Sequence, residues 1–352
     1  MRAAIIFLVC WVCLGPMAAG WGAEEEGQPT VGAERKEEKK AARPLTALSD
    51  KGAISAGPSW RLVIEPSFEY DHISSQNVAI SGFTIFEAIL IGTVVVEKLK
   101  RDIYLPAVTF RLGYKQAEFS IKVPYLIRQD TAIYPQPQGS GSVVQKGFSD
   151  SDLGDLQPYF YYHLIREGRW RPWVPDTIVR MGMNIPTGRD PFHLTREQIP
   201  GLGLVPTEFP TGTGMWGGTW GVTFVKSADP AVLFLSMAYF YNFARDVGTA
   251  GTPSVNYGTI KLGNSFEYNI GFILALQERF SVNFALNQRI TGKTTRNGQN
   301  LPDTSINAIA FNIGATYVVN PRFSLDLLVG IGLTPDAPDA SILVRMPITF
   351  LF

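Results

Sequence analysis

The sequence predicts an all-β chain that folds as a transmembrane antiparallel up-and-down β-barrel of about 12 strands. Three features predict this fold. Apolar and polar residues alternate at period two in long segments from Trp60 to Phe352, as expected for strands with two different faces. The connections between these segments alternate between tight turns and long polar stretches. The last segment is an apolar strand that ends on an aromatic residue.

The composition excludes several classes of protein. The 31 Lys and Arg residues balance 31 Asp and Glu residues, so the chain has no net charge that attracts a polyanion, and nucleic acid is not expected as a partner. Charged residues make up 18% and aromatic residues 12% of the chain. An average soluble domain has about 25% charged residues. The composition therefore disfavours a disordered chain or an ordinary cytosolic enzyme.

Residues 1–22 have the pattern of a secretory signal peptide. Arg2 is followed by an apolar run over residues 3–14 and then by small residues. A transmembrane anchor is the alternative, but the run is shorter than the roughly 20 residues that a spanning helix needs. Cys10 and Cys13 both lie in this segment. The mature chain is therefore predicted to contain no cysteine, which excludes disulfides, thiol catalysis and cysteine-bound metals.

Residues 23–59 are predicted to form a charged, flexible periplasmic segment. Glu24 to Glu26 and the mixed Glu/Lys run over residues 34–40 leave too few apolar side chains to offset the entropy of ordering. The alternative is a plug that enters the pore of the barrel, because plugged lumens occur in this class of protein.

The barrel is predicted over residues 60–352, with strands longer than the five or six residues typical of globular proteins. Strands of about 9–11 residues or more cross a bilayer when tilted. The predicted strands are residues 60–70, 103–115, 117–128, 153–165, 173–186, 215–226, 231–243, 257–275, 280–291, 305–319, 323–334 and 340–352. Residues 71–102 contain the apolar run 88–96. This region is either an outer hairpin or two further strands, which makes 14 possible.

The connections are asymmetric. Tight turns are predicted at residues 168–169, 227–230, 277–279 and 320–322, and long loops at residues 129–150, 188–214, 244–256 and 292–304. Outer-membrane barrels have short periplasmic turns and long outer loops. We therefore expect a chain that is secreted through the inner membrane by a cleaved signal peptide and placed in the cell outer membrane of a Gram-negative bacterium, with lipid around its outer face.

Phe350 and Phe352 end one apolar face of the last predicted strand. This ending resembles the terminal assembly signal of bacterial outer-membrane barrels, which the barrel-assembly machinery reads. The resemblance implies that this machinery is a partner of the chain.

Four short phrases resemble the MetA-pathway of phenol degradation family. They are residues 121–125 (IKVPY), 151–156 (SDLGDL), 181–188 (MGMNIPTG) and 344–348 (VRMPI). Their order and spacing carry the resemblance, which covers most of the chain from Trp60 onward. It implies an outer-membrane transporter that passes small molecules, hydrophobic or aromatic compounds among them.

Alternation assigns charged residues to the inner face of the barrel, because a charge on the lipid face costs about 2–4 kcal/mol near the midplane. The predicted pore-lining residues are Arg61, Glu65, Glu69, Arg111, Glu118, Lys122, Asp155, Arg180, Lys226, Lys261, Glu267, Arg289, Asp326 and Arg345. His163 has the same phase near a strand end. The eight basic residues outnumber the six acidic ones, which predicts a faint preference for anions. The alternative is a network of ion pairs that only stabilises the barrel.

No catalytic, metal or cofactor site is predicted. None of the 3 histidines has metal-ligand spacing with another. Asp71 and His72 resemble an acid–base pair, but adjacent residues on a strand point to opposite faces.

The sequence therefore predicts a monomeric, non-enzymatic outer-membrane channel for passive passage of a small-molecule solute. The alternative is a non-transporting barrel that acts as a scaffold or adhesion protein through its long loops or its N-terminal segment.

Overall fold

The computed structural model describes residues 60–74, 77–80, 83–86, 98–135, 143–168, 171–199, 203–252 and 254–352. These residues form strands, turns and loops and no helix. A helix with the length and hydropathy needed to cross a membrane is accordingly absent from the described ranges. The predicted signal peptide 1–22, the charged segment 23–59 and the apolar run 88–96 lie outside these ranges.

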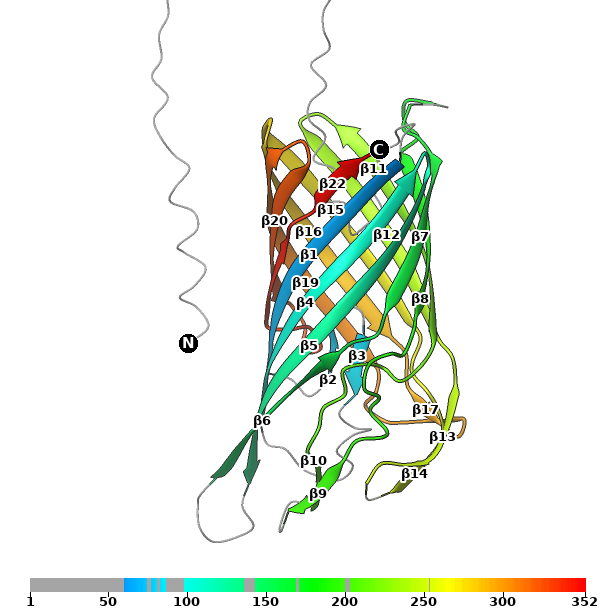
Figure 1. Ribbon diagram of the computed structural model, residues 1–352, viewed down its shortest axis with the longest axis vertical. Helices are drawn as coiled ribbons and strands as arrows, with labels where there is room; N and C mark the ends of the chain where they lie inside the picture. Colours follow the sequence, from blue (N-terminus) through cyan, green and yellow to red (C-terminus); the bar gives the residue numbers. More distant parts are fainter. Residues whose placement is uncertain are drawn as a thin grey trace, which may run out of the picture. The chain divides into compact units, whose positions relative to one another are not determined.

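Twelve antiparallel strand positions close into a barrel, as predicted (Figure 1). In chain order they are β1 (Trp60–Ile73), β4 (Lys98–Tyr114), β5 (Ala117–Pro135), β7 (Gln157–Ile165), β8 (Asp176–Asn184), β11 (Gly217–Ala228), β12 (Ala231–Asn242), β15 (Ser265–Gln277), β16 (Phe280–Thr291), β19 (Ile306–Asn320), β20 (Phe323–Gly332) and the broken strand β21 (Ala340–Arg345) and β22 (Ile348–Leu351). The last position pairs with both β20 and β1. The barrel therefore closes between the first and last described strands.

The remaining strands extend the barrel at its loop end. β6 (Val143–Leu153) pairs with the outer part of β5. Three small sheets are formed by β2 (Asn77–Ile80) with β3 (Phe83–Phe86), by β9 (Arg196–Ile199) with β10 (Gly203–Pro206), and by β13 (Arg245–Ala250), β14 (Val255–Lys261), β17 (Thr295–Arg296) and β18 (Gln299–Asn300). β2 and β3 pair only with each other among the described strands, so they do not enlarge the barrel to 14.

The two ends of the barrel differ. The backbone N–H of Phe352 donates to the carbonyl of Trp60 over 3.0 Å, so the ends of the closed sheet lie together. Figure 1 shows β22 at the end of the barrel that carries the tight turns, and β9, β10, β13 and β14 at the opposite end. One predicted turn, at 168–169, is wrong in length, because β7 ends at Ile165 and β8 begins at Asp176.

The strands carry an apolar outer face and a polar inner face. Large apolar side chains are exposed along the outside, for example Phe68, Phe110, Phe119, Phe160, Met181, Leu233, Ile270 and Leu325. Polar side chains are buried along the inside, for example Thr109, Ser120, Thr223, Ser236, Asn269 and Thr316. This distribution is the reverse of that in a soluble barrel, and it matches a wall with lipid outside and polar groups inside.

Three predicted boundaries are wrong for identifiable reasons. The loop predicted at 129–150 begins with the end of β5 and finishes as β6, because charged side chains continue the inward alternation there. The strand predicted at 257–275 is two strands, β14 and β15. The last strand breaks at Pro347, which has no backbone N–H to donate to a ladder.

Candidate functional site

A cavity of about 310 Å³ lies inside the barrel. Its polar walls come from strands all around the barrel, and its apolar lining includes Leu328, Leu343 and Ala310. Six of the predicted inner-face residues line it: Glu69, Arg111, Lys122, Arg180, Glu267 and Arg289. These side chains lie where period-two alternation places them, so the structure brings this part of the predicted set together around one space.

Toward the turn end, two ion pairs connect β1 with β5 and with β4. The Arg61 guanidinium contacts the Glu118 carboxylate. Nη2 of Arg111 lies 3.1 Å from Oε1 of Glu65. The two glutamates and Arg111 are buried. These residues face inward as predicted. Within each pair, the carboxylate and the guanidinium compensate each other's charge, which buried ions require.

A third inward pair joins β20 to β21. Asp326 and Arg345 are direct cross-strand neighbours, both are buried, and Nε of Arg345 lies 4.0 Å from Oδ2 of Asp326. Close to the turn end, Nε2 of the buried His163 lies 3.3 Å from Oδ1 of Asp176. Asp326 and His163 therefore each lie beside a partner on the inner wall.

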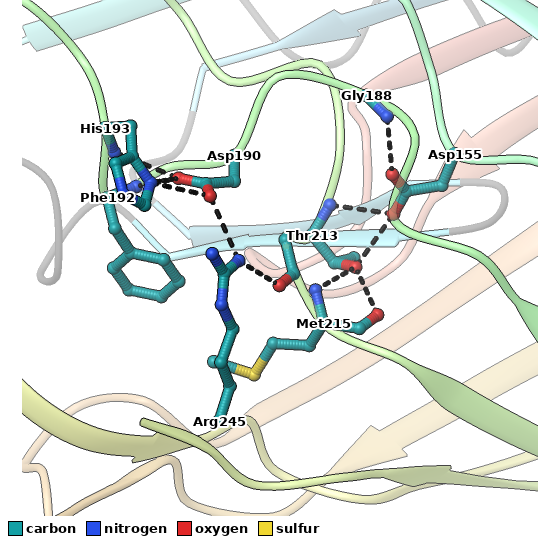
Figure 2. A network of polar contacts seen from close by, with 9 residues as sticks. Asp155, Gly188, Asp190, Phe192, His193, Thr213, Met215 and Arg245 are labelled. Atoms are coloured by element: carbon teal, nitrogen blue, oxygen red, sulfur yellow. Dashed lines mark hydrogen bonds and ion pairs between the residues drawn. The ribbon is translucent and has the colours of Figure 1, made fainter. Parts of the chain in front are cut away.

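Asp155 lies between β6 and β7 and holds a loop rather than lining the cavity. Its Oδ2 accepts hydrogen bonds from the Thr213 N–H and Oγ1, both at 2.8 Å, and from Asn184 Nδ2 at 2.8 Å. Its Oδ1 accepts from the Gly188 N–H at 3.1 Å. Figure 2 shows the bonds from Thr213 and Gly188 converging on this carboxylate. A Cβ at Gly212 would lie 2.1 Å from Oδ1 of Asp155, so the loop approaches as closely as only glycine allows.

Asp190 organises the same β8–β11 connection farther along. Its Oδ1 accepts from the N–H groups of Phe192 and His193, both at 2.9 Å. Its Oδ2 lies 3.0 Å from Nη1 of Arg245, which also donates to the Gly214 carbonyl at 2.6 Å (Figure 2). Burial of Asp190 favours a higher pKa, but the hydrogen bonds from His193 and Phe192 outweigh it, so the pKa lies below its ordinary value.

This depressed pKa predicts a loop that weakens only in acid. A carboxylate whose folded pKa is below its unfolded value stabilises the fold above the unfolded pKa, near 3.8 here, and loses that contribution as the pH falls through the folded pKa. We expect the amides of Phe192 and His193 to stay protected from hydrogen exchange at pH 6 and to lose protection near pH 3. Asp190→Asn should show weak protection at both pH values. Equal protection of the wild type at both, after correction for intrinsic rates, would contradict this.

An apolar cluster adjoins the cavity at its loop end. Phe192 and Met215 from the β8–β11 connection, Tyr257 of β14 and Ile306 of β19 form one buried cluster. The cluster also contains Ala308 and Ala337, and these two residues line the cavity as well. The polar cavity therefore ends, on its outer side, against an apolar cluster built from loops.

The comparisons with known proteins agree with this architecture. An outer membrane channel from Pseudomonas putida F1 aligns over 86% of this chain and 98% of its own, with 13% identity and a TM-score of 0.56. The chain has the fold of that channel. The beta domain of the Bordetella autotransporter BrkA aligns over 83% of this chain and 100% of its own, with 11% identity and a TM-score of 0.43. A deletion mutant of the TodX monoaromatic hydrocarbon channel aligns over 84% and 91%, with 12% identity and a TM-score of 0.38. No family model matches the chain.

Lys226 lies on the outer face, not on the inner face as predicted. It pairs across the strands with Leu233, which is exposed on the outside. Its Nζ lies 2.7 Å from Oε1 of Glu167 at the turn end, where a long lysine reaches the rim of the barrel. Burial raises the pKa of Glu167, but hydrogen bonds from Lys226 and Ser227 outweigh that effect and lower it.

Lys261 is also misplaced by the alternation. It ends β14 in a loop sheet, and its Nζ lies 4.6 Å from the ring centroid of Tyr241. Tyr241 shares the outer face of β12 with the exposed Tyr239. The prediction treated residues 257–275 as one strand, but the break at residues 262–264 resets the phase of the alternation.

A buried charge cluster that was not predicted from the sequence lies in the outer half of the wall. Asp130 accepts from Nε and Nη2 of Arg101, both at 3.0 Å, and from Nε of Arg128 at 2.9 Å. All three residues are buried, and the Arg128 guanidinium lies 4.1 Å from the ring centroid of Phe209. Residues 128 and 130 continue the inward phase of β5, and that alternation was the signal for strand rather than loop.

Asp71 and His72 point to opposite faces, as strand geometry requires. Asp71 is buried and lines the cavity, whereas Nδ1 of His72 lies 2.8 Å from Oδ1 of Asp102 on the outer face. Across the described ranges, no group of three His, Cys, Asp or Glu side chains is arranged to hold a metal ion.

Proposed function

We propose that this chain is an outer-membrane channel through which small molecules pass by diffusion. The observation that carries the proposal is the polar cavity inside a closed barrel whose outer face is apolar. Such a wall suits a position in lipid, and such an interior suits water and solute. The fold shared with a bacterial outer membrane channel supports the same location.

The resemblance to the MetA-pathway of phenol degradation family supports a more specific proposal about the transporter. On this proposal the chain belongs to that family, is secreted through a signal peptide, and acts as a monomer on hydrophobic or aromatic solutes among others. Phe350 and Phe352 are exposed at the turn end of the outer wall. This exposure suits a signal that the barrel-assembly machinery reads.

One observation favours a second function. An apolar cluster that includes loop residues adjoins the cavity, and a barrel that such a cluster seals is suited to a scaffold or adhesion role through its loops. The two functions differ in whether the loops open.

Single-channel recording of the refolded protein in a planar bilayer tests the proposal. We expect discrete conductance steps, because a polar interior conducts ions whenever the loop cluster opens. A variant that lacks residues 23–59 tests the plug, since its removal raises the conductance if the segment obstructs the pore. Absence of current from both forms, with folding verified by heat-modifiable migration in gels, would overturn the channel and favour the scaffold.

A further inference from the structure

Two arginines on different strands of the cavity wall reach toward the same strand. Arg180 lies on β8, and its side chain passes over Gly221 of the neighbouring β11. A Cβ at Gly221 would lie 2.7 Å from Nε and 2.9 Å from Cγ of Arg180. Glycine at this position therefore leaves the space through which the guanidinium extends across β11 in the direction of β12.

Arg289 approaches β12 from the other side. It lies on β16, two strands away from β12, with β15 between them. Its guanidinium carbon nevertheless lies 4.4 Å from the ring centroid of Phe240 on β12. Both arginine side chains line the cavity. They therefore converge on the inner face of β12, where the small residue Ala238 leaves room.

Both guanidiniums have hydrogen-bonding capacity left over. Nε of Arg180 and Nε of Arg289 are buried, and neither has a hydrogen-bond partner among the described residues. A buried donor without an acceptor costs about 1–3 kcal/mol, so native structures seldom leave one unpaired. Glu267 is the acidic residue of this patch, directly across the strands from Ala238 and Arg289. Two cations and one carboxylate leave the patch one positive charge in excess.

We propose that Arg180 and Arg289 form an anion-binding site over β12, and that this site takes the carboxylate of a small organic acid. The inference rests on the proposed channel function and names its solute class. A planar carboxylate accepts paired hydrogen bonds from guanidinium groups, and a single negative charge balances the excess of the patch. The apolar remainder of the acid has Leu328, Leu343 and Ala310 of the same cavity to pack against.

Glu267 is the internal competitor of the bound acid. Its carboxylate lies in the same patch, directly across the strands from Arg289. Its negative charge offsets part of the positive charge of the two arginines when no acid is bound. Glu267→Gln keeps the shape of the side chain and removes this competition. We therefore expect Glu267→Gln to bind a carboxylate more tightly than the wild type does.

Benzoate against chloride is the probe for this site. Reversal potentials are measured across a bilayer with potassium chloride on one side and potassium benzoate on the other, for the wild type and for Arg180→Gln/Arg289→Gln. We expect the benzoate-to-chloride permeability ratio to fall by about tenfold or more in the double variant, the fold-change that the loss of one hydrogen bond to a charged group represents. Arg180→Lys/Arg289→Lys keeps the charges and should retain part of the preference.

Lys122→Gln is the control, because it removes one positive charge from the same cavity, on β5, where the double variant removes two. An equal fall in this variant, or no fall in the double arginine variant, would overturn the site. Calorimetric titration of the detergent-folded proteins with benzoate separates this proposal from channel function. If benzoate binding is lost in the double arginine variant and is stronger in Glu267→Gln, the site is supported even where no form conducts. If the protein conducts but shows no such binding, the site is overturned and the channel function stands.

Discussion

Replacing Asp155 by alanine is expected to release the β8–β11 connection from the barrel wall and to raise the open probability of the proposed channel. The carboxylate accepts from two backbone N–H groups and two side chains, and it is 1% exposed. Hydrogen bonds to a charged group contribute about 1.5–3 kcal/mol each. The loss of four of them leaves Thr213 and Gly188 without their acceptor.

The measurement combines hydrogen exchange at Gly188 and Thr213 with single-channel recording. Asp152→Ala is the control, because Asp152 also binds this connection, with Oδ2 3.0 Å from Nη2 of Arg189, but its side chain is 45% exposed. We expect the control to change exchange and open probability little, since exposed ion pairs contribute about 0–1 kcal/mol. Unchanged protection of Gly188 and Thr213 in Asp155→Ala would show that other contacts hold the loop.

Asp130→Ala is expected to have the largest effect on stability. The substitution leaves the guanidiniums of Arg101 and Arg128 buried without the carboxylate that both contact. Removing one member of a buried ion pair costs about 3–5 kcal/mol, because the remaining charge loses a compensating partner. The free energy of unfolding, measured by urea titration of the protein in lipid vesicles with tryptophan fluorescence, should fall by this amount.

Asp102→Ala provides the comparison on an adjacent position of the same region. Its carboxylate contacts His72 from the outer face and is 34% exposed, so we expect a loss of less than about 1 kcal/mol. Similar losses for the two variants would mean that burial does not control the energetics of this cluster.

The strand positions were predictable because one physical constraint acts along each strand. Residues 280–291 were predicted as a strand, and β16 spans Phe280–Thr291. Successive side chains there face alternately the apolar outside and the polar interior of the barrel. The alternation in the local sequence therefore predicts the strand. The loop sheet of β13, β14, β17 and β18 was not predictable, since its pairing depends on contacts between separate loops.

The candidate site was predictable only as far as the phase of alternation holds. Glu69, Arg111 and Arg289 face the cavity because their strands run without interruption. Lys261 was misplaced because the chain breaks between β14 and β15. The role of Asp155 depends on Thr213, which is 58 positions away in the sequence, and no local pattern reports such a contact. The same is true of Arg101 and Asp130, which are direct partners on the neighbouring strands β4 and β5.

The seam between β1 and the broken strand β21–β22 has a consequence for the order of assembly. The residues that close the sheet are those farthest apart in the described sequence, as the bond between Phe352 and Trp60 shows. Until they meet, the sheet has two unpaired edges, and such edges associate with other strands. Contacts of this sequence separation also form slowly. Closure at this seam is therefore the step at which the chain either completes its own sheet or associates with other strands through its open edges.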